Sequence, residues 1–142
     1  MPYAQGTVVP VDRSRSEIER QLVRFKAEGF AYGWDGGQEI IGFMYAGKQV
    51  RMSIPMPSRG SYRSEESWQQ ERRRRWRALA MVVKAKLVAV EDGIISFEDE
   101  FLSYFVLPNG STLGQVMIPR LDAAAESGDL PPLLLSSPRG HA

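Results

Sequence analysis

The chain has 142 residues with 43% hydrophobic and 25% charged side chains, which fits one folded domain and is too short for two separate cores. It has no cysteine and one histidine, His141 near the C-terminus, which excludes disulfides, thiolate or histidine metal sites and Ser-His-Asp triads. The net charge is +1, and neither an apolar run of about 18 residues nor a basic-then-apolar leader is present, so we expect a cytoplasmic protein that neither spans a membrane nor is secreted.

The first 29 residues predict an arm followed by a helix. Residues 1–13 contain two prolines and no sustained period, so we expect an extended arm whose valines lie along a sheet edge. Ser14 followed by Glu17 has the spacing of a capping box, and apolar residues at helical spacing continue as far as Phe25. We therefore expect an amphipathic helix over residues 14–29 that a glycine closes.

Residues 30–55 predict a three-stranded antiparallel meander, because two glycine turn signals separate three runs of aromatic and β-branched residues. If the turns centre on Gly36-Gly37 and Gly47-Lys48, the expected pairs are Phe30 with Phe43, Tyr32 with Ile41, Phe43 with Met52 and Tyr45 with Val50. One face then collects the bulky side chains that pack on the helices: Phe30, Tyr32, Ile41, Phe43, Tyr45, Val50, Met52 and Ile54. The opposite face has few bulky side chains, and this flat surface suits self-association.

Residues 64–92 predict a long helix with a basic start, preceded by a polar loop over residues 58–63. Ser64 is the expected N-cap, and Glu65 and Glu66 suit the positive end of the helix dipole. One apolar stripe at helical spacing faces the core: Trp76, Leu79, Ala80, Val83, Leu87 and Val90. Because the opposite side is also largely apolar beyond the arginines, we expect this helix to be covered on more than one side and to be the central element of the fold.

The remaining residues predict two short helices and an extended tail. Ser96 with Asp99 is a further capping signal, and a second short helix follows a Pro-Asn-Gly turn. We expect helical structure over residues 96–127, kinked or shortened at Pro119, and a tail over residues 128–142 whose consecutive leucines dock on the body. The whole chain is therefore predicted to be a single α+β domain with the element order α-β-β-β-α-α-α.

Seven short segments spread over most of the chain carry family marks: Ser14–Glu19, Tyr32–Asp35, Ile54–Pro57, Arg73–Leu79, Lys84–Leu87, Phe97–Leu102 and Leu107–Gly110. In these marks the sequence resembles a family of small, mostly uncharacterised proteins of tailed bacteriophages and prophages. The resemblance implies a setting inside a host bacterial cell, and either an accessory role in DNA transactions or antagonism of a host system. It supplies no activity.

The sequence contains no catalytic or cofactor pattern. The Gly36-Gly37 pair lacks the spacing that binds phosphates. The element order also occurs in a superfamily of metal-dependent nucleases, but the third strand reads Val-Arg-Met-Ser-Ile without a Glu-x-Lys pattern, and Asp35 lies in a turn. Glu98, Asp99 and Glu100 point about 100° apart on a helix and cannot converge on one ion. We therefore expect a non-enzymatic protein without metal or cofactor.

A cluster of arginines at the start of the long helix carries the functional prediction. Residues 51–91 contain ten cations and four carboxylates, whereas residues 92–142 contain two cations and seven carboxylates. The candidate site consists of seven arginines and one tyrosine: Arg59, Tyr62, Arg63, Arg72, Arg73, Arg74, Arg75 and Arg77. Tyr62 is the candidate for stacking on a base. We call the last five arginines the arginine run. Five guanidiniums within two helical turns repel one another unless carboxylates or a bound polyanion offset their charge.

Two explanations of the arginine run stay open. It binds nucleic acid, as an accessory in recombination or replication, or it pairs within the chain with Glu65, Glu66, Glu71 and the acidic C-terminal segment. A three-stranded meander with a long helix also recurs in double-stranded RNA-binding domains and single-strand annealing proteins, an analogy of fold alone. The alternative function is the binding of a host enzyme or an anti-phage defence complex through the same surface. The flat sheet face and the apolar back of the long helix also suit a homo-oligomer.

Overall fold

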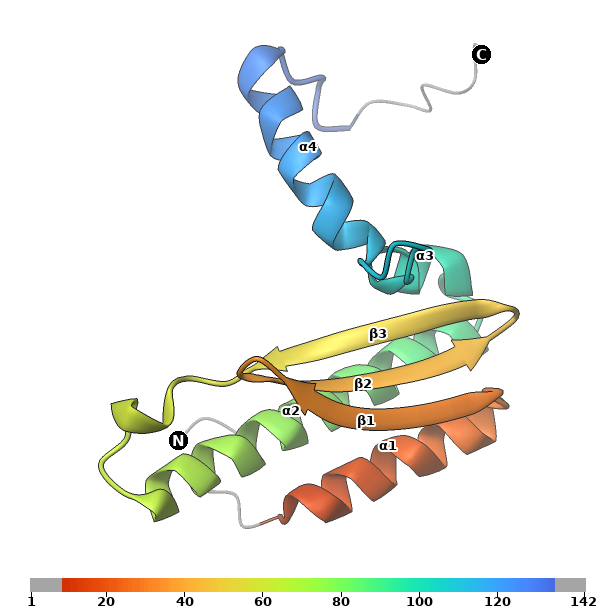
Figure 1. The fold of residues 1–142 in the computed structure, drawn as a ribbon. Helices are drawn as coiled ribbons and strands as arrows, with labels where there is room; N and C mark the ends of the chain where they lie inside the picture. The colour runs from red at the N-terminus through yellow and green to blue at the C-terminus, as the bar shows by residue number, and fades with distance from the viewer. Residues whose placement is uncertain (1–8, 135–142) are drawn as a thin grey trace.

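A computed structural model describes residues 9–134, in which two helices that run in the same direction cover one face of a three-stranded sheet (Figure 1). Its elements are α1 (Val11–Phe25), β1 (Gly29–Asp35), β2 (Gln38–Tyr45), β3 (Lys48–Pro55), the 3-10 turn η1 (Arg59–Ser61), α2 (Glu65–Glu91), α3 (Phe97–Phe101), the 3-10 turn η2 (Leu102–Tyr104) and α4 (Leu113–Ser127). The α+β class and the order of helices and strands predicted from the sequence are confirmed.

Helix α1 begins three residues earlier than predicted, at Val11. The carbonyl of Pro10 accepts hydrogen bonds from the amides of Arg13 and Ser14, and Val11 extends the buried stripe of the helix. Burial therefore determines where the helix begins, since no side chain caps it. The capping box at Ser14 is wrong, because Ser14 is fully buried on the core face. The predicted end is also wrong, since Lys26 in the left-handed conformation (φ 70°) ends the helix. Most of the predicted arm, residues 1–8, lies outside the described residues.

The sheet is an antiparallel meander in the order β1-β2-β3, joined by two-residue turns. The first hairpin has the predicted register, with Tyr32 opposite Ile41. The second does not, because Ala46 and Gly47 (φ 53° and 75°) form the turn, so Phe43 lies opposite Val50 instead of Met52. Since this shift is two residues, every side chain keeps its predicted face.

The core lies between this sheet and the helices, and Trp76 of α2 is its largest fully buried side chain among the described residues. The buried apolar residues are Val11, Ile18, Leu22, Phe25, Ile41, Phe43, Val50, Met52, Ile54, Trp76, Ala80, Val83, Leu87, Phe97 and Phe101. The predicted inner face of the sheet is therefore largely confirmed. Tyr32 is the exception at 49% exposure, on the edge strand β1, where the guanidinium of Arg15 stacks 4.2 Å from its ring centroid.

Helix α2 has the predicted cap at Ser64 and the predicted buried stripe. The sheet, α1 and α3 contact it, but its outward strip is open among the described residues: Met81 and Val82 are 43% and 44% exposed. The first turn of α2 is held against the segment that follows β3, because Trp68 donates its indole N–H to the carbonyl of Pro57 at 3.4 Å.

The C-terminal helices behave differently from each other. Helix α3 joins the core through Phe101, whose ring lies edge-on 5.5 Å from that of Phe43. Helix α4 projects away from the rest of the chain (Figure 1) and continues through Pro119 to Ser127, so the predicted shortening is wrong. The predicted docking of the tail leucines is wrong for Leu133 and Leu134, which are 96% and 93% exposed, because α4 carries the chain away from the body.

Candidate binding site

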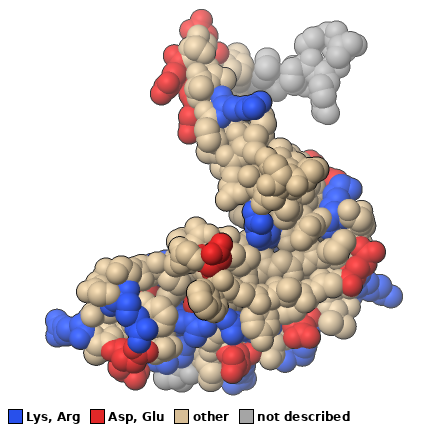
Figure 2. Space-filling model, viewed as in Figure 1, with Lys and Arg blue, Asp and Glu red and all other residues tan. Residues whose placement is uncertain are grey.

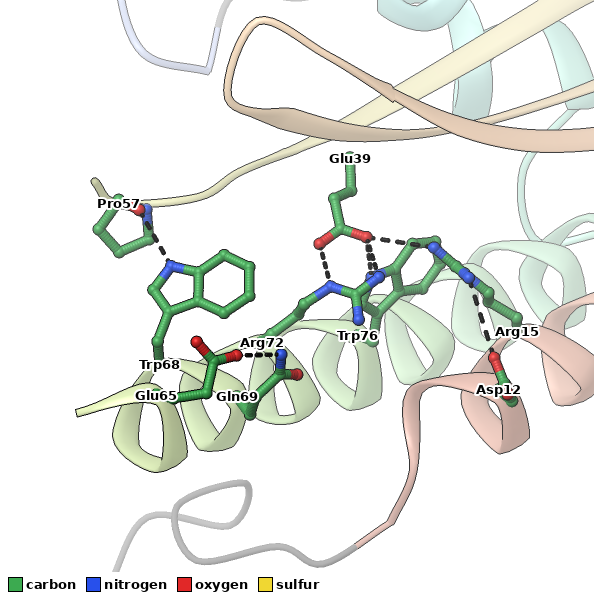
Figure 3. A network of polar contacts seen from close by, with 9 residues as sticks. All are labelled: Asp12, Arg15, Glu39, Pro57, Glu65, Trp68, Gln69, Arg72 and Trp76. Carbon is green, nitrogen blue, oxygen red and sulfur yellow. Dashed lines mark hydrogen bonds and ion pairs between the residues drawn. The ribbon is translucent and has the colours of Figure 1, made fainter. Parts of the chain in front are cut away.

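The first arginine of the run, Arg72, is bonded to a buried glutamate, Glu39 of β2 (Figure 3). Both carboxylate oxygens accept from Arg72, one through Nε and the other from Nη2 at 2.8 Å. Trp76 donates its indole N–H to the same carboxylate at 2.9 Å, and Arg15 of α1 lies 3.2 Å from it. This network joins both helices to the sheet, so Arg72 is a structural brace.

The charge of Glu39 is stabilised despite its burial, with only 6% of the residue exposed. Burial alone raises the pKa of its carboxyl. The hydrogen bonds from Arg72 and Trp76, with the charges of Arg72 and Arg15, together outweigh burial and hold the pKa below its ordinary value. Glu39 is therefore ionised near neutral pH, and its negative charge offsets the nearby guanidiniums.

Two further arginines of the run share Glu71 on the same helix. Arg74 donates through Nε and Nη2 at 2.9 and 2.6 Å, and Arg75 donates through Nε at 2.6 Å. The bond from Arg74, opposed by partial burial and helped by the bond from Arg75, lowers the pKa of Glu71 to about 2. The predicted i, i+4 pair of Glu71 with Arg75 is present, and Arg75 also donates to the carbonyl of Pro55.

The remaining two arginines of the run also meet carboxylates. Arg73 lies 3.2 Å from Glu66, and Arg77 lies 2.7 Å from Glu17 of α1. Within residues 9–134 these carboxylates come from α1, β2 and α2, whereas the acidic end of α4 lies far from the run (Figures 1 and 2). Figure 2 shows blue and red side chains intermixed over the lower body and a group of red ones at the far end of α4.

The loop before α2 contains the other three predicted site residues. Arg59 forms an ion pair with Glu65 and stacks over Trp68, with its Cζ 4.7 Å from the ring centroid. Tyr62 is half-buried, and Arg63 is exposed without an ion pair or hydrogen bond in the described part of the chain. The fold therefore separates the eight predicted residues into an engaged run and a more open loop.

Beside this loop lies a surface groove of about 520 Å³, between the β1–β2 turn and the start of α2. Its lining includes Trp34, Gln38, Met56, Pro57, Arg59 and Trp68, and we call it the tryptophan groove. Trp34 is 81% exposed, and the Glu39–Arg72 pair lies at the groove with its hydrogen bonds already made. The groove thus presents apolar and aromatic surface. The Glu39–Arg72 pair adds no net charge to it, because the two opposite charges cancel.

Sequence reasoning missed the two residues that give this region its character. Glu39 lies two residues before Ile41 and four before Phe43, on the same face of β2, and this spacing indicated a core-facing carboxylate. A charge at such a position requires a partner, and the arginine run supplied candidates. Trp34 follows Tyr32 on the same face of β1, but its exposure depends on tertiary packing, which no local pattern specifies.

Within residues 9–134 no group of three acidic or histidine side chains is placed to hold a metal ion. No helix in that same part of the chain is long and apolar enough to cross a membrane. Comparisons with protein-family models, with curated proteins and with solved structures each returned no match. The class that fold and site define is an α+β protein with an aromatic surface groove beside a braced arginine cluster.

Proposed function

We propose that this protein is a non-enzymatic binding module, and that its tryptophan groove receives an apolar side chain from a segment of a partner protein. The observation that carries the proposal is Trp34, whose ring is 81% exposed beside a groove lined by Trp68 and Met56. Exposed tryptophans cost free energy in water and are over-represented among the residues that dominate protein interfaces.

The pairing of the arginines favours a protein partner over a polyanion. Each arginine of the run already has a carboxylate, so a phosphate backbone would have to displace those contacts to gain its usual electrostatic affinity. Among the described residues, the cation without an ion pair that lies nearest in sequence to the groove-lining Arg59 is Arg63. We therefore expect the partner segment to present one large apolar side chain with an acidic residue close by in its sequence.

The biological setting of this proposal comes from the resemblance to phage and prophage proteins. In that setting the partner is a host enzyme or an anti-phage defence complex in the bacterial cytoplasm, and binding antagonises it. The neighbouring genes provide an independent check: known antagonists of host defence would support this setting, and recombination genes would favour a role in DNA transactions.

The test compares one variant of the tryptophan groove with one control variant, each at an apolar side chain of similar fractional exposure. Trp34→Ala removes the groove wall, whereas Ile94→Ala removes a 77% exposed side chain in the α2–α3 connection. In a capture from nuclease-treated host lysate, followed by affinity measurement with the purified partner, we expect Trp34→Ala to weaken binding tenfold or more, by analogy with aromatic hot spots of roughly 2 kcal/mol. Equal affinity of both variants for that partner would refute the proposal.

Nucleic acid is the second candidate partner, and one specific observation favours it. Arg63 is exposed without a partner among the described residues, and the stack of Arg59 on Trp68 lies in the same loop region. If this loop binds phosphates, log K should fall linearly with log salt, and replacing Arg59 and Arg63 by Ala should reduce the slope by roughly two. Absence of any DNA or RNA shift at low salt would eliminate this candidate.

A further inference from the structure

Over β1 and β2, the outer face of the sheet lacks the polar character expected of a surface that faces water. One-sided antiparallel sheets usually alternate apolar residues inward with polar residues outward. Here the outward positions over the central parts of β1 and β2 are Ala31, Gly33, Ile40, Gly42 and Met44. Met44 is 44% exposed, and the helices cover only the opposite face (Figure 1). This outer face is flat and open; it is apolar over β1 and β2, and polar over β3, where Gln49, Arg51 and Ser53 point outward.

Helix α4 is fixed at its root on the same side of the molecule. Arg51, an outward residue of β3, donates to the carbonyl of Gly110 at 2.6 Å, and Thr112 and Gln115 form a capping box. Gly114 is buried against η2, where an added Cβ would lie 3.0 Å from the carbonyl oxygen of Ser103. These contacts direct α4 away from its own sheet, so it cannot cover that sheet without losing them.

Beyond this root, α4 exposes apolar side chains that the described residues do not cover. Met117, Ile118 and Leu121 are 38%, 54% and 62% exposed. Helical spacing places Met117 and Leu121 on one stripe, with the small residues of the following alanine run continuing it. A firmly built root that supports an uncovered apolar helix indicates that the helix packs on something outside this copy of the chain.

The helix and the outer face match in length and charge. Helix α4 has 15 residues and is about 22 Å long, and the eight residues of β2 span about 26 Å. Asp122 and Glu126 of α4 have no ion pair within residues 9–134, whereas Arg51 on the outer face is bonded only to neutral groups. Helix α4 also carries one cation, Arg120, so its C-terminal half has a net charge of −1 that complements Arg51, and both surfaces occur in every copy.

We propose that α4 of one copy lies on the outer sheet face of a second copy, with a two-fold axis relating two such contacts. An isologous arrangement uses each surface twice, once as the helix and once as the sheet, and so doubles the area that one contact buries. Stable interfaces need roughly 800 Å² per partner, which one helix contact alone would not readily supply. This inference does not depend on the tryptophan groove.

The first test is the oligomeric state of the full chain, measured by sedimentation or light scattering across the micromolar range. We expect a dimer for the native chain and a monomer for both Leu121→Glu and Met44→Glu, each with an unchanged circular dichroism spectrum because both side chains are exposed. The control Val23→Glu, at a 68% exposed position on α1, should remain dimeric. The proposal would be overturned if the native chain were monomeric over the whole concentration range. It would also be overturned if the Leu121→Glu chain and the Met44→Glu chain each remained dimeric.

Mixing the two monomeric variants provides a sharper test of the exchange. The Leu121→Glu chain keeps an intact sheet face, and the Met44→Glu chain keeps an intact helix, so together they restore one of the two contacts. Because one contact buries less area than two, we expect heterodimers that are weaker than the native dimer but detectable at the highest concentrations, where neither variant forms a dimer alone. A mixture that stays monomeric even at the highest concentrations would refute helix-on-sheet exchange. That result would instead favour pairing between two α4 helices or between two sheets.

Disulfide trapping distinguishes a second copy from α4 of the same copy. The chain has no cysteine, so Met44→Cys and Leu121→Cys can be introduced on separate chains without competing thiols. Under oxidation the mixed chains should link predominantly as heterodimers. A chain carrying both cysteines that forms only an internal disulfide would show that α4 folds onto its own sheet, and the proposal would fail.

Discussion

At the scale of single residues, the stability of this protein depends on carboxylates that face arginines. Glu39 accepts from Arg72, Trp76 and Arg15, which come from two helices. A buried carboxylate with several donors is stabilised as long as all partners are present, but removal of one partner leaves a charge that neither water nor protein solvates fully. The arginine run therefore has a structural role in addition to any role in binding.

The Glu39–Arg72 pair gives a prediction for a double-mutant cycle. Arg72→Met should destabilise the protein by roughly 2–4 kcal/mol, because Glu39 would keep its burial and lose its bidentate donor. Adding Glu39→Leu should recover part of this loss, since the unpaired charge is removed as well. Chemical denaturation of the three variants measures the coupling, and simple additivity of the two changes would contradict a coupled pair.

Glu71 gives a prediction for pH dependence. Its pKa in the folded protein is about 2, below the ordinary value of 4.5, so its contribution is fully present above the ordinary value and is lost as pH falls toward 2. Because Arg74 is 37% exposed, solvent screening leaves this contribution at roughly 1 kcal/mol. The free energy of unfolding should therefore fall less between pH 4.5 and pH 2 in the Glu71→Gln variant than in the native chain. An unchanged acid profile would show that the pair contributes nothing.

At the scale of elements, turn chemistry determines how the strands pair. The β2–β3 hairpin needs positive φ at both turn residues, and Ala46 adopts φ 53° although its Cβ disfavours that conformation. The expected turn at Gly47-Lys48 assumed that glycine would come first. Instead glycine occupies the second turn position, and the strand pairing on either side imposes the left-handed conformation on the alanine.

Ala46→Gly is predicted to stabilise the protein by roughly 0.5–1 kcal/mol, because relief of the left-handed alanine exceeds the added entropy of glycine in the unfolded chain. The matched control is Ala31→Gly at an exposed strand position, which should destabilise by a similar amount. Thermal or denaturant unfolding of both variants measures the difference. Destabilisation by both substitutions would contradict the conformation assigned to the turn.

At the scale of the whole molecule, the chain divides into a well-buried body and a projecting helix. The body contains the sheet, α1, α2 and α3, with the core centred on Trp76. Helix α4 contacts η2 at its root, and every described residue from 119 to 134 is exposed. Local stability should therefore differ strongly between the two parts.

Amide hydrogen exchange tests this difference. In dilute solution, where self-association is absent, exchange should be slowest in β2 and around Val83, because the central strand is bonded on both sides and that part of α2 is buried. Residues 120–127 should exchange many times faster. At high concentration the same residues should become protected if α4 packs on a second copy. Strong protection of α4 in the dilute sample would contradict its projection from the body.

The sequence by itself determined the types and order of the elements, the cap at Ser64, the buried stripe of α2 and the position of the arginine run, because these follow from local spacing. It also indicated Glu71 as the partner of Arg75, since the two lie one turn apart. Only the tertiary structure decided that Glu39 and Glu17, 33 and 60 residues away, neutralise Arg72 and Arg77. It likewise decided the direction of α4 and the exposure of Trp34. These features depend on contacts between segments that are distant in the chain, and the energy of such contacts has no signature in the local pattern.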